Sequence, residues 1–176
     1  RLFIAIDLPP AAKKELSSLC YGVQGIRWVP RENIHLTLRF IGEVPRNLYN
    51  EIRELLHTIE FHPFELATTN LDFFSGAKGP TTLWMGIEEN DDLENLQREI
   101  EKKLRILGIK ADKKKFKAHI TLGRTEDLFF GDLQPFFDQG INLKKHHFEV
   151  NSFELFSSRL GGPSPQYLVE ESDPLD

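Results

Sequence analysis

The sequence is poor in sulfur-containing residues and lacks long apolar runs. Its 176 residues include one cysteine, Cys20, and one methionine. Cys20 therefore has no partner in the chain for a disulfide, and nothing in the composition calls for an oxidising compartment. No stretch approaches the roughly 18 apolar residues of a membrane-spanning helix. The apolar run at residues 2–6 is shorter than the core of a signal peptide and leads directly into acid and proline. We expect a cytoplasmic protein that makes no contact with membranes.

Positive charge is also in deficit. Lysine and arginine number 22 against 27 acidic residues, which gives a formal net charge of −5. This balance argues against a protein that coats nucleic acid non-specifically, but it is compatible with a local pocket for one phosphate. The basic residues gather around two short segments of the chain. Residues 119–122 are preceded by Lys110, Lys113, Lys114, Lys115 and Lys117, and residues 35–38 are surrounded by Arg27, Arg31 and Arg39. A lysine run is equally typical of a solvent-exposed turn, so its role stays open.

Several motifs of cofactor and metal chemistry are missing from the sequence. It contains no Walker-type Gly-x-x-x-x-Gly-Lys-Ser/Thr and no Gly-x-Gly-x-x-Gly. No group of histidine, cysteine and acidic residues has the spacing of a zinc site. We therefore expect neither a cofactor nor a metal.

The apolar pattern predicts strands that alternate with helices. The length fits one domain with two lobes, residues 1–176. Strands are expected at residues 2–8, 33–41, 64–74, 81–87, 118–123, 148–158 and 167–170. Helices are expected at about residues 10–20, 45–59 and 91–107, the last being the clearest because acids crowd its start and a glycine follows its end. Residues 75–80 are predicted to form a turn, and residues 129–137 a short helix or turn.

Two segments of the chain share the pattern His-x-Thr-Leu, at residues 35–38 and 119–122. Residues two apart on a strand point to the same face, so His35 shares a face with Thr37, and His119 with Thr121. The aliphatic residues between them would face a core and fix their direction. Strand, helix and His-containing strand recur in each half, which predicts two similar lobes that bring both faces to one cleft.

This pairing suits attack on a phosphodiester without a metal. An in-line displacement needs one group to accept a proton from the nucleophile and another to donate one to the leaving oxygen. Histidine does both near its ordinary pKa of about 6.5. Threonine hydroxyls can bind phosphate oxygens, and an arginine can offset the developing charge. Arg39 shares the parity of His35 and Thr37 and is a candidate phosphate ligand, although a solvated arginine at a strand end fits equally well.

Three stretches of the chain resemble the RNA 2′,3′-cyclic phosphodiesterases of the two-histidine phosphoesterase superfamily, once called 2′-5′ RNA ligases. They are RLFIAIDLP (residues 1–9), WVPRENIHLTLRFIGEV (residues 28–44) and FKAHITLGR (residues 116–124). The likeness extends over most of the chain. It implies an α+β fold: a bilobal, pseudo-twofold arrangement of two antiparallel sheets, with outer helices and a central cleft that holds both motifs.

The resemblance also implies a reaction, the hydrolysis of a terminal 2′,3′-cyclic phosphate to a 2′-phosphate. In this scheme His35 protonates the leaving 3′ oxygen and His119 activates water. Thr37 and Thr121 hold the phosphate, and Arg124 assists. Members of the family are also associated with joining RNA halves through a 2′-5′ bond, the same site running in reverse. The expected partners are RNA 3′ ends or small oligoribonucleotides, bound by a monomer.

Two other functions are compatible with the same residues. One is hydrolysis of another phosphoester, such as a cyclic nucleotide derivative or a 2′-5′ oligonucleotide. The other is binding of RNA ends without turnover, which the paired histidines disfavour because binding needs cations rather than titrating groups. Trp28, Phe40, Phe73 and Phe74 are candidates for stacking on a base, with core packing as the alternative for each.

Overall fold

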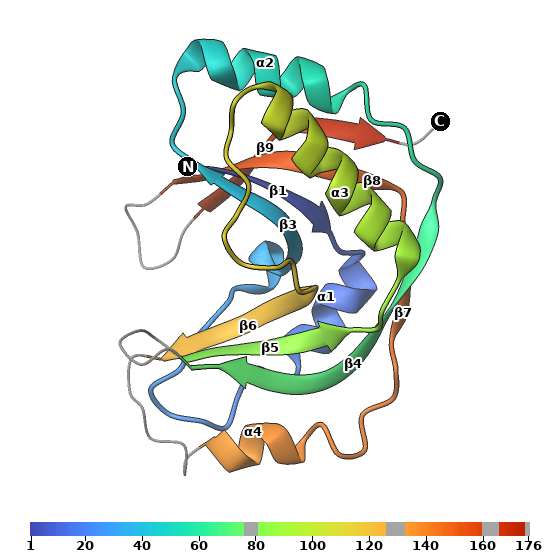
Figure 1. Cartoon of the computed structure of the whole chain (residues 1–176). Helices are drawn as coiled ribbons and strands as arrows, with labels where there is room; N and C mark the ends of the chain where they lie inside the picture. Colours follow the sequence, from blue (N-terminus) through green and yellow to red (C-terminus); the bar gives the residue numbers. More distant parts are fainter. Residues whose placement is uncertain (76–80, 126–132, 160–165, 175–176) are drawn as a thin grey trace.

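The computed structural model describes residues 1–75, 81–125, 133–159 and 166–174. Two antiparallel sheets make up its body (Figure 1), which confirms the predicted α+β class. The first sheet has the order β3-β1-β8-β9, with β1 at Leu2–Asp7, β3 at His35–Gly42, β8 at Ser152–Arg159 and β9 at Gln166–Pro174. The second has the order β2-β6-β5-β4-β7, with β2 at Arg27–Trp28, β4 at Phe64–Phe74, β5 at Thr81–Ile87, β6 at His119–Thr125 and β7 at His147–Val150.

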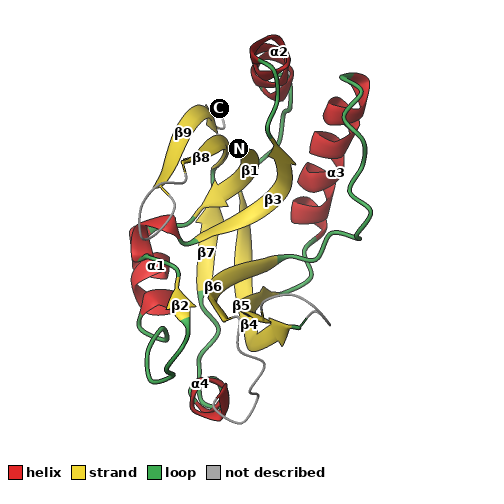
Figure 2. Ribbon diagram, turned by 90° about the vertical axis from the view of Figure 1, so that its left-hand side faces the viewer, coloured by secondary structure: helices red, strands yellow, loops and turns green. Residues whose placement is uncertain are grey.

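The helices lie outside the sheets. They are α1 (Pro10–Ser17), α2 (Arg46–Leu56), α3 (Asp91–Ile106) and α4 (Gln134–Asp138), with a 3₁₀ turn at Arg31–Asn33. In Figure 2, α2 lies at the top of the molecule, α3 on the right, α1 on the left and α4 at the bottom, below the second sheet. No helix in the described ranges is long and apolar enough to cross a membrane.

The helix α3 agrees with the prediction for residues 91–107 because local features of the sequence specify it. The Asn90 side chain accepts a hydrogen bond of 3.0 Å from the Leu93 N–H and so caps the first turn. Acids follow in that turn, where the helix dipole favours them. The predicted apolar stripe is buried against the core.

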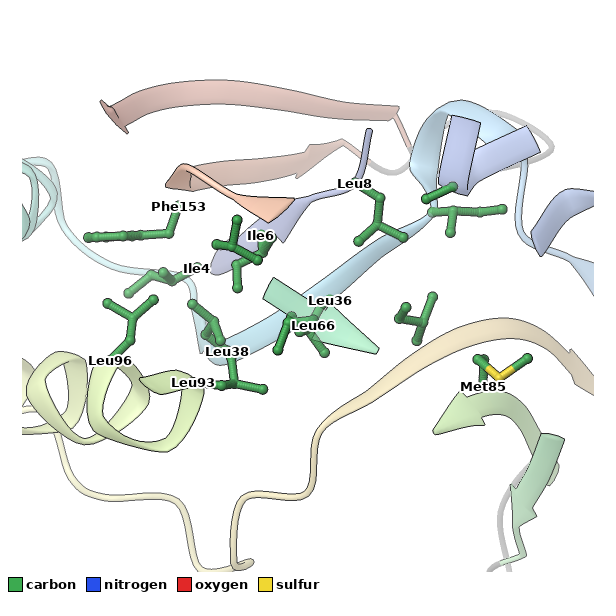
Figure 3. Packing of buried hydrophobic residues seen from close by; sticks show 14 of the residues in the cluster. Ile4, Ile6, Leu8, Leu36, Leu38, Leu66, Met85, Leu93, Leu96 and Phe153 are labelled. Atoms are coloured by element: carbon green, nitrogen blue, oxygen red, sulfur yellow. The ribbon is translucent and has the colours of Figure 1, made fainter. Parts of the chain in front are cut away.

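One large apolar cluster joins both sheets to their helices (Figure 3). Ile4, Leu36 and Leu38 of the first sheet belong to it together with Leu93 and Leu96 of α3. Each such side chain stabilises the fold by about 1.5–3 kcal/mol when fully buried. These strands bury one face against the helices. Their opposite faces form the walls of a cleft.

Several predicted elements differ from the structure. The helix expected at residues 45–59 ends at Leu56, and the strand expected at residues 167–170 extends over Gln166–Pro174. The strand expected at residues 148–158 is divided at Asn151: β7 pairs with β4 in the second sheet and β8 with β1 in the first. The helix expected to reach about Cys20 ends at Ser17 and continues as a turn, with the Cys20 N–H bonded to the Ser17 carbonyl. The two-residue strand β2 was not predicted. Residues 76–80 of the predicted turn and 129–132 of the uncertain segment lie outside the described residues.

Candidate active site

A cavity of about 110 Å³ lies where the two sheets meet. The strands that carry the two motifs, β3 and β6, contact each other there. The cavity is lined by His35, Thr37 and Phe40 from the first sheet and by His119, Thr121 and Arg124 from the second. The structure therefore brings together both predicted histidines, both threonines and Arg124, and it leaves Arg39 outside the cavity lining.

The imidazole of His35 is held at both nitrogens. Its Nδ1 lies 2.6 Å from the Asn33 carbonyl oxygen, and its Nε2 lies 2.8 Å from Thr37 Oγ1. A carbonyl can only accept, so Nδ1 carries a proton and Nε2 is the nitrogen that exchanges one. The ring also packs on Phe3, with 5.0 Å between ring centroids.

His119 repeats this arrangement. Its Nδ1 lies 2.7 Å from the Lys117 carbonyl oxygen, again two residues before the histidine. By the same argument its Nδ1 carries a proton and Nε2 is free to exchange. The ring meets Phe74 edge-on at 5.1 Å between centroids and Trp84 at 5.8 Å. The two halves thus present equivalent nitrogens on different aromatic supports.

The charges around His35 have both signs. Burial lowers the pKa of its imidazole from the ordinary value because the charged form loses water. The hydrogen bond to Asn33 and the carboxylate of Asp7 raise this pKa, while Lys13 and Arg124 lower it. Asp7 stands directly opposite His35 in the strand pair and lies 2.7 Å from the Lys13 ammonium. His35 therefore has an acidic neighbour that favours its protonated form.

The charges around His119 are positive. Burial again lowers the pKa of the imidazole most, and the hydrogen bond to the Lys117 carbonyl opposes this. The cations of Arg124 and Lys117 lower the pKa further. The Lys117 ammonium lies 4.9 Å from the centre of the Trp84 ring, a cation–π contact that holds it beside the histidine. These charges favour the neutral form of His119.

A bulge in β3 explains why Arg39 does not reach the cavity. Ala5 stands opposite Thr37, but the preceding residue Ile4 stands opposite Arg39, so Leu38 is an extra residue on β3. A bulge reverses the alternation of faces beyond it. Phe40, rather than Arg39, returns to the face of His35.

Strand β6 carries the same bulge at the equivalent place. Trp84 stands opposite Thr121 and Leu83 opposite Gly123, so Leu122 is the extra residue. Arg124 consequently returns to the face of Thr121. Strict alternation from the sequence would have placed Gly123 there instead.

The guanidinium of Arg39 lies in the interior of the protein. Its Nε lies 2.6 Å from Glu101 Oε1 on α3, and its side chain is 8% exposed. Its terminal nitrogens donate to the carbonyls of Lys110 and Phe40. Both expectations for Arg39 are wrong, because its side chain points neither to the phosphate site nor to solvent but forms a buried ion pair with α3.

The four candidate stacking residues divide into two pairs. Trp28 and Phe73 pack against phenylalanines of α4, with ring centroids 5.8 and 5.7 Å apart. Phe40 lines the cavity and is 52% exposed. Phe74 is 38% exposed and contacts His119. Only Phe40 and Phe74 therefore lie where they can meet a substrate.

The aromatic residues that pack against the two histidines were not predicted from the sequence. Phe3, Ala5 and Phe156 form a small buried cluster of their own, and Phe3 and Phe156 contact the His35 ring. Trp84 does the same for His119. One signal was present: residues 2–6 are apolar without alternation, which is typical of a strand buried on both faces.

A family model and several known proteins match most of the chain. A family model described as LigT like Phosphoesterase matches residues 6–84 and 86–167. The RNA 2′,3′-cyclic phosphodiesterase of Thermotoga maritima is 32% identical over 175 residues, or 96% of this chain and 92% of the relative. The protein of the same name from Archaeoglobus fulgidus is 34% identical over 129 residues, or 72% of this chain and 73% of the relative.

Solved structures share the fold. The protein TT0787 of Thermus thermophilus superposes with a TM-score of 0.80 at 25% identity, covering 99% of this chain and 97% of that one. E. coli LigT complexed with 3′-AMP superposes with a TM-score of 0.80 at 22% identity over the same shares of the two chains. The predicted arrangement of two antiparallel sheets with helices is thus also that of known proteins.

Proposed function

Because the chain belongs to the LigT-like phosphoesterase family, we propose that it hydrolyses a terminal 2′,3′-cyclic phosphate of RNA to a 2′-phosphate. The relatives named above carry the corresponding activity in their names. The observation that supports the proposal most is the matched pair of imidazoles on one small cavity, each with Nδ1 bonded to a backbone carbonyl. A site that only bound RNA ends would not need two such groups.

In the proposed reaction, water attacks phosphorus in line with the bond to the 3′ oxygen. Nε2 of His119 accepts a proton from the water, a new P–O bond forms, and the P–O3′ bond breaks. Nε2–H of His35 donates its proton to O3′. Burial lowers the pKa of both imidazoles, and their charged neighbours differ: the carboxylate of Asp7 raises the pKa of His35, whereas the neighbours of His119 that shift its pKa by charge, Arg124 and Lys117, are both cations. A 5′-hydroxyl in place of water would give a 2′-5′ bond by the same proton transfers.

The remaining polar residues of the cavity would stabilise the charge on the phosphate. Thr37 Oγ1 is already within hydrogen-bond distance of His35 Nε2, so it can reach an oxygen on the same phosphorus. Thr121 is its equivalent in the other motif. The charge of Arg124 lowers the pKa of both histidines, so it would act close to each proton transfer. Such preorganised donors are worth about 10²–10³ in kcat each.

A product analysis tests the proposal. We expect the protein to convert an oligoribonucleotide ending in a 2′,3′-cyclic phosphate to the 2′-phosphate in the presence of EDTA. The two isomeric products are separated by chromatography and identified by phosphorus NMR. Formation of the 3′-phosphate alone, or loss of turnover in EDTA, would contradict the mechanism.

The pH dependence of the reaction follows from the lowered histidine pKa values. The rate falls at low pH as His119 gains a proton and at high pH as His35 loses one. Because both pKa values lie below the ordinary 6.5, kcat/KM should be bell-shaped with its maximum below pH 6.5. Bound phosphate is negative and raises both pKa values, so the maximum of kcat should lie at higher pH. A flat kcat/KM profile between pH 5 and 9 is incompatible with this account.

A further inference from the structure

A second, larger cavity lies at the end of β3. It measures about 670 Å³ and is lined by residues that include Arg1, Arg46 and Arg53. We call it the arginine groove. Among the described residues that line it, Glu43 alone is acidic. In a chain with a net charge of −5, three arginines on one cavity form a local concentration of positive charge that suits phosphate groups.

Two of these arginines are available to bind a ligand. Arg1 and Arg46 are exposed, and no hydrogen bond or ion pair joins either side chain to a residue within the described ranges. Arg53 lies against the Tyr49 ring, 5.6 Å from its centroid, which orients its guanidinium. Arg1 and Arg46 are thus two cations of the groove that no described residue neutralises.

The arginine groove lies one strand pair beyond the active-site cavity, at the end of β1 and β3 next to α2. Phe3 and Phe40 face each other in the strand pair and line the active-site cavity. The next pair along the strands, Leu2 and Gly42, lines the groove. Ser158, a lining residue of the active-site cavity, donates its N–H to the Arg1 carbonyl at 2.8 Å. The start of β1, the end of β3 and the connection to α2 lie together at this corner (Figure 1).

The proposed reaction determines where the rest of an RNA must go, and the inference about the groove rests on that function. Water enters on the side of His119, and O3′ leaves on the side of His35. The ribose carries O3′, so it lies on the side of the first sheet, and the nucleotides 5′ to it extend from there. We propose that the arginine groove binds the phosphates of these upstream nucleotides, with the exposed ring of Phe40 between the two cavities.

The opposite direction is electrostatically unfavourable. The cavity on the side of the second sheet has a volume of about 560 Å³ and includes Lys115 and Lys117. Its lining also includes four acidic residues, Asp72, Glu88, Glu89 and Glu94. These carboxylates outnumber the lysines and would repel a phosphodiester chain.

The inference is tested by comparing two substrates of different length. One is a nucleoside 2′,3′-cyclic phosphate, and the other is a trinucleotide ending in the same group. The natural sequence should show a higher kcat/KM for the trinucleotide. Arg46→Ala should reduce the ratio of the two kcat/KM values about threefold to tenfold, and Arg46→Lys should restore part of it. The trinucleotide's advantage should also fall as salt rises, and less steeply in Arg46→Ala.

A lysine of the run before His119 provides the matched control. Lys113 is exposed and lies outside the linings of all three cavities, and Lys113→Ala should keep the natural ratio. Equal kcat/KM for the two substrates, or a ratio that falls in Lys113→Ala and not in Arg46→Ala, would overturn the inference. Failure of the proposed function would look different, because the nucleoside cyclic phosphate would then not be hydrolysed at all.

Discussion

Replacing His119 by alanine should lower kcat about 10²–10⁴-fold while leaving the fold intact. The side chain lies at the cavity, and among the described residues its Nε2 has no hydrogen-bond partner, so the substitution removes a proton acceptor without exposing a structural network. His35→Ala should lose activity by a similar factor on the natural substrate. Single-turnover rates and a thermal melt of each variant check both parts of this expectation.

A histidine outside the cavity serves as the control for these variants. His62 is exposed in the connection between α2 and β4, and His62→Ala should keep the natural rate. If either cavity variant retained a rate within threefold of the natural sequence, catalysis by two histidines would be refuted.

Replacing Arg39 by methionine should destabilise the protein by about 3 kcal/mol, near the lower end of the range for breaking a buried ion pair. The lower end applies because Glu101, which would lose its partner, is 18% exposed and keeps some contact with water. The carbonyl of Lys110 would also lose its donor. Urea denaturation followed by circular dichroism measures this loss in the free energy of unfolding.

The activity of the same variant separates the two roles considered for Arg39. Because the guanidinium lies in the interior against α3, kcat/KM measured well below the melting temperature should change less than about twofold. Arg98→Met on the exposed face of α3 is the matched control and should alter stability by less than about 0.5 kcal/mol. If the Arg39→Met protein had normal stability and greatly reduced activity, Arg39 would have to be a phosphate ligand and not a partner of Glu101.

The sequence contains enough information to orient the two motifs but not the residues immediately after them. Strand alternation correctly pairs His35 with Thr37 and His119 with Thr121. It fails one residue later, since Leu38 and Leu122 are both extra residues in bulges. A leucine in a bulge looks like any other leucine of a strand, and only the register with the neighbouring strand reveals it.

The division of the predicted strand at residues 148–158 has a similar cause. Both parts are extended and apolar enough for a strand, and each pairs with a different sheet on either side of Asn151. Pairing partners are far away in the sequence and leave no local pattern. The helix α3, in contrast, is specified by its own cap, charges and apolar stripe, which are all local.

The central claim is that His35 and His119 act as acid and base on opposite sides of one phosphorus. It is tested most directly with a 3′-deoxynucleoside 2′-(4-nitrophenyl phosphate), in which 4-nitrophenolate takes the place of O3′ as the leaving group and departs without a proton, and which has no 3′-hydroxyl to attack the phosphorus. On this substrate His35→Ala should recover most of the natural rate, whereas His119→Ala should remain as impaired as on the cyclic phosphate. Equal impairment of both variants on both substrates, or recovery in His119→Ala instead, would contradict the assignment.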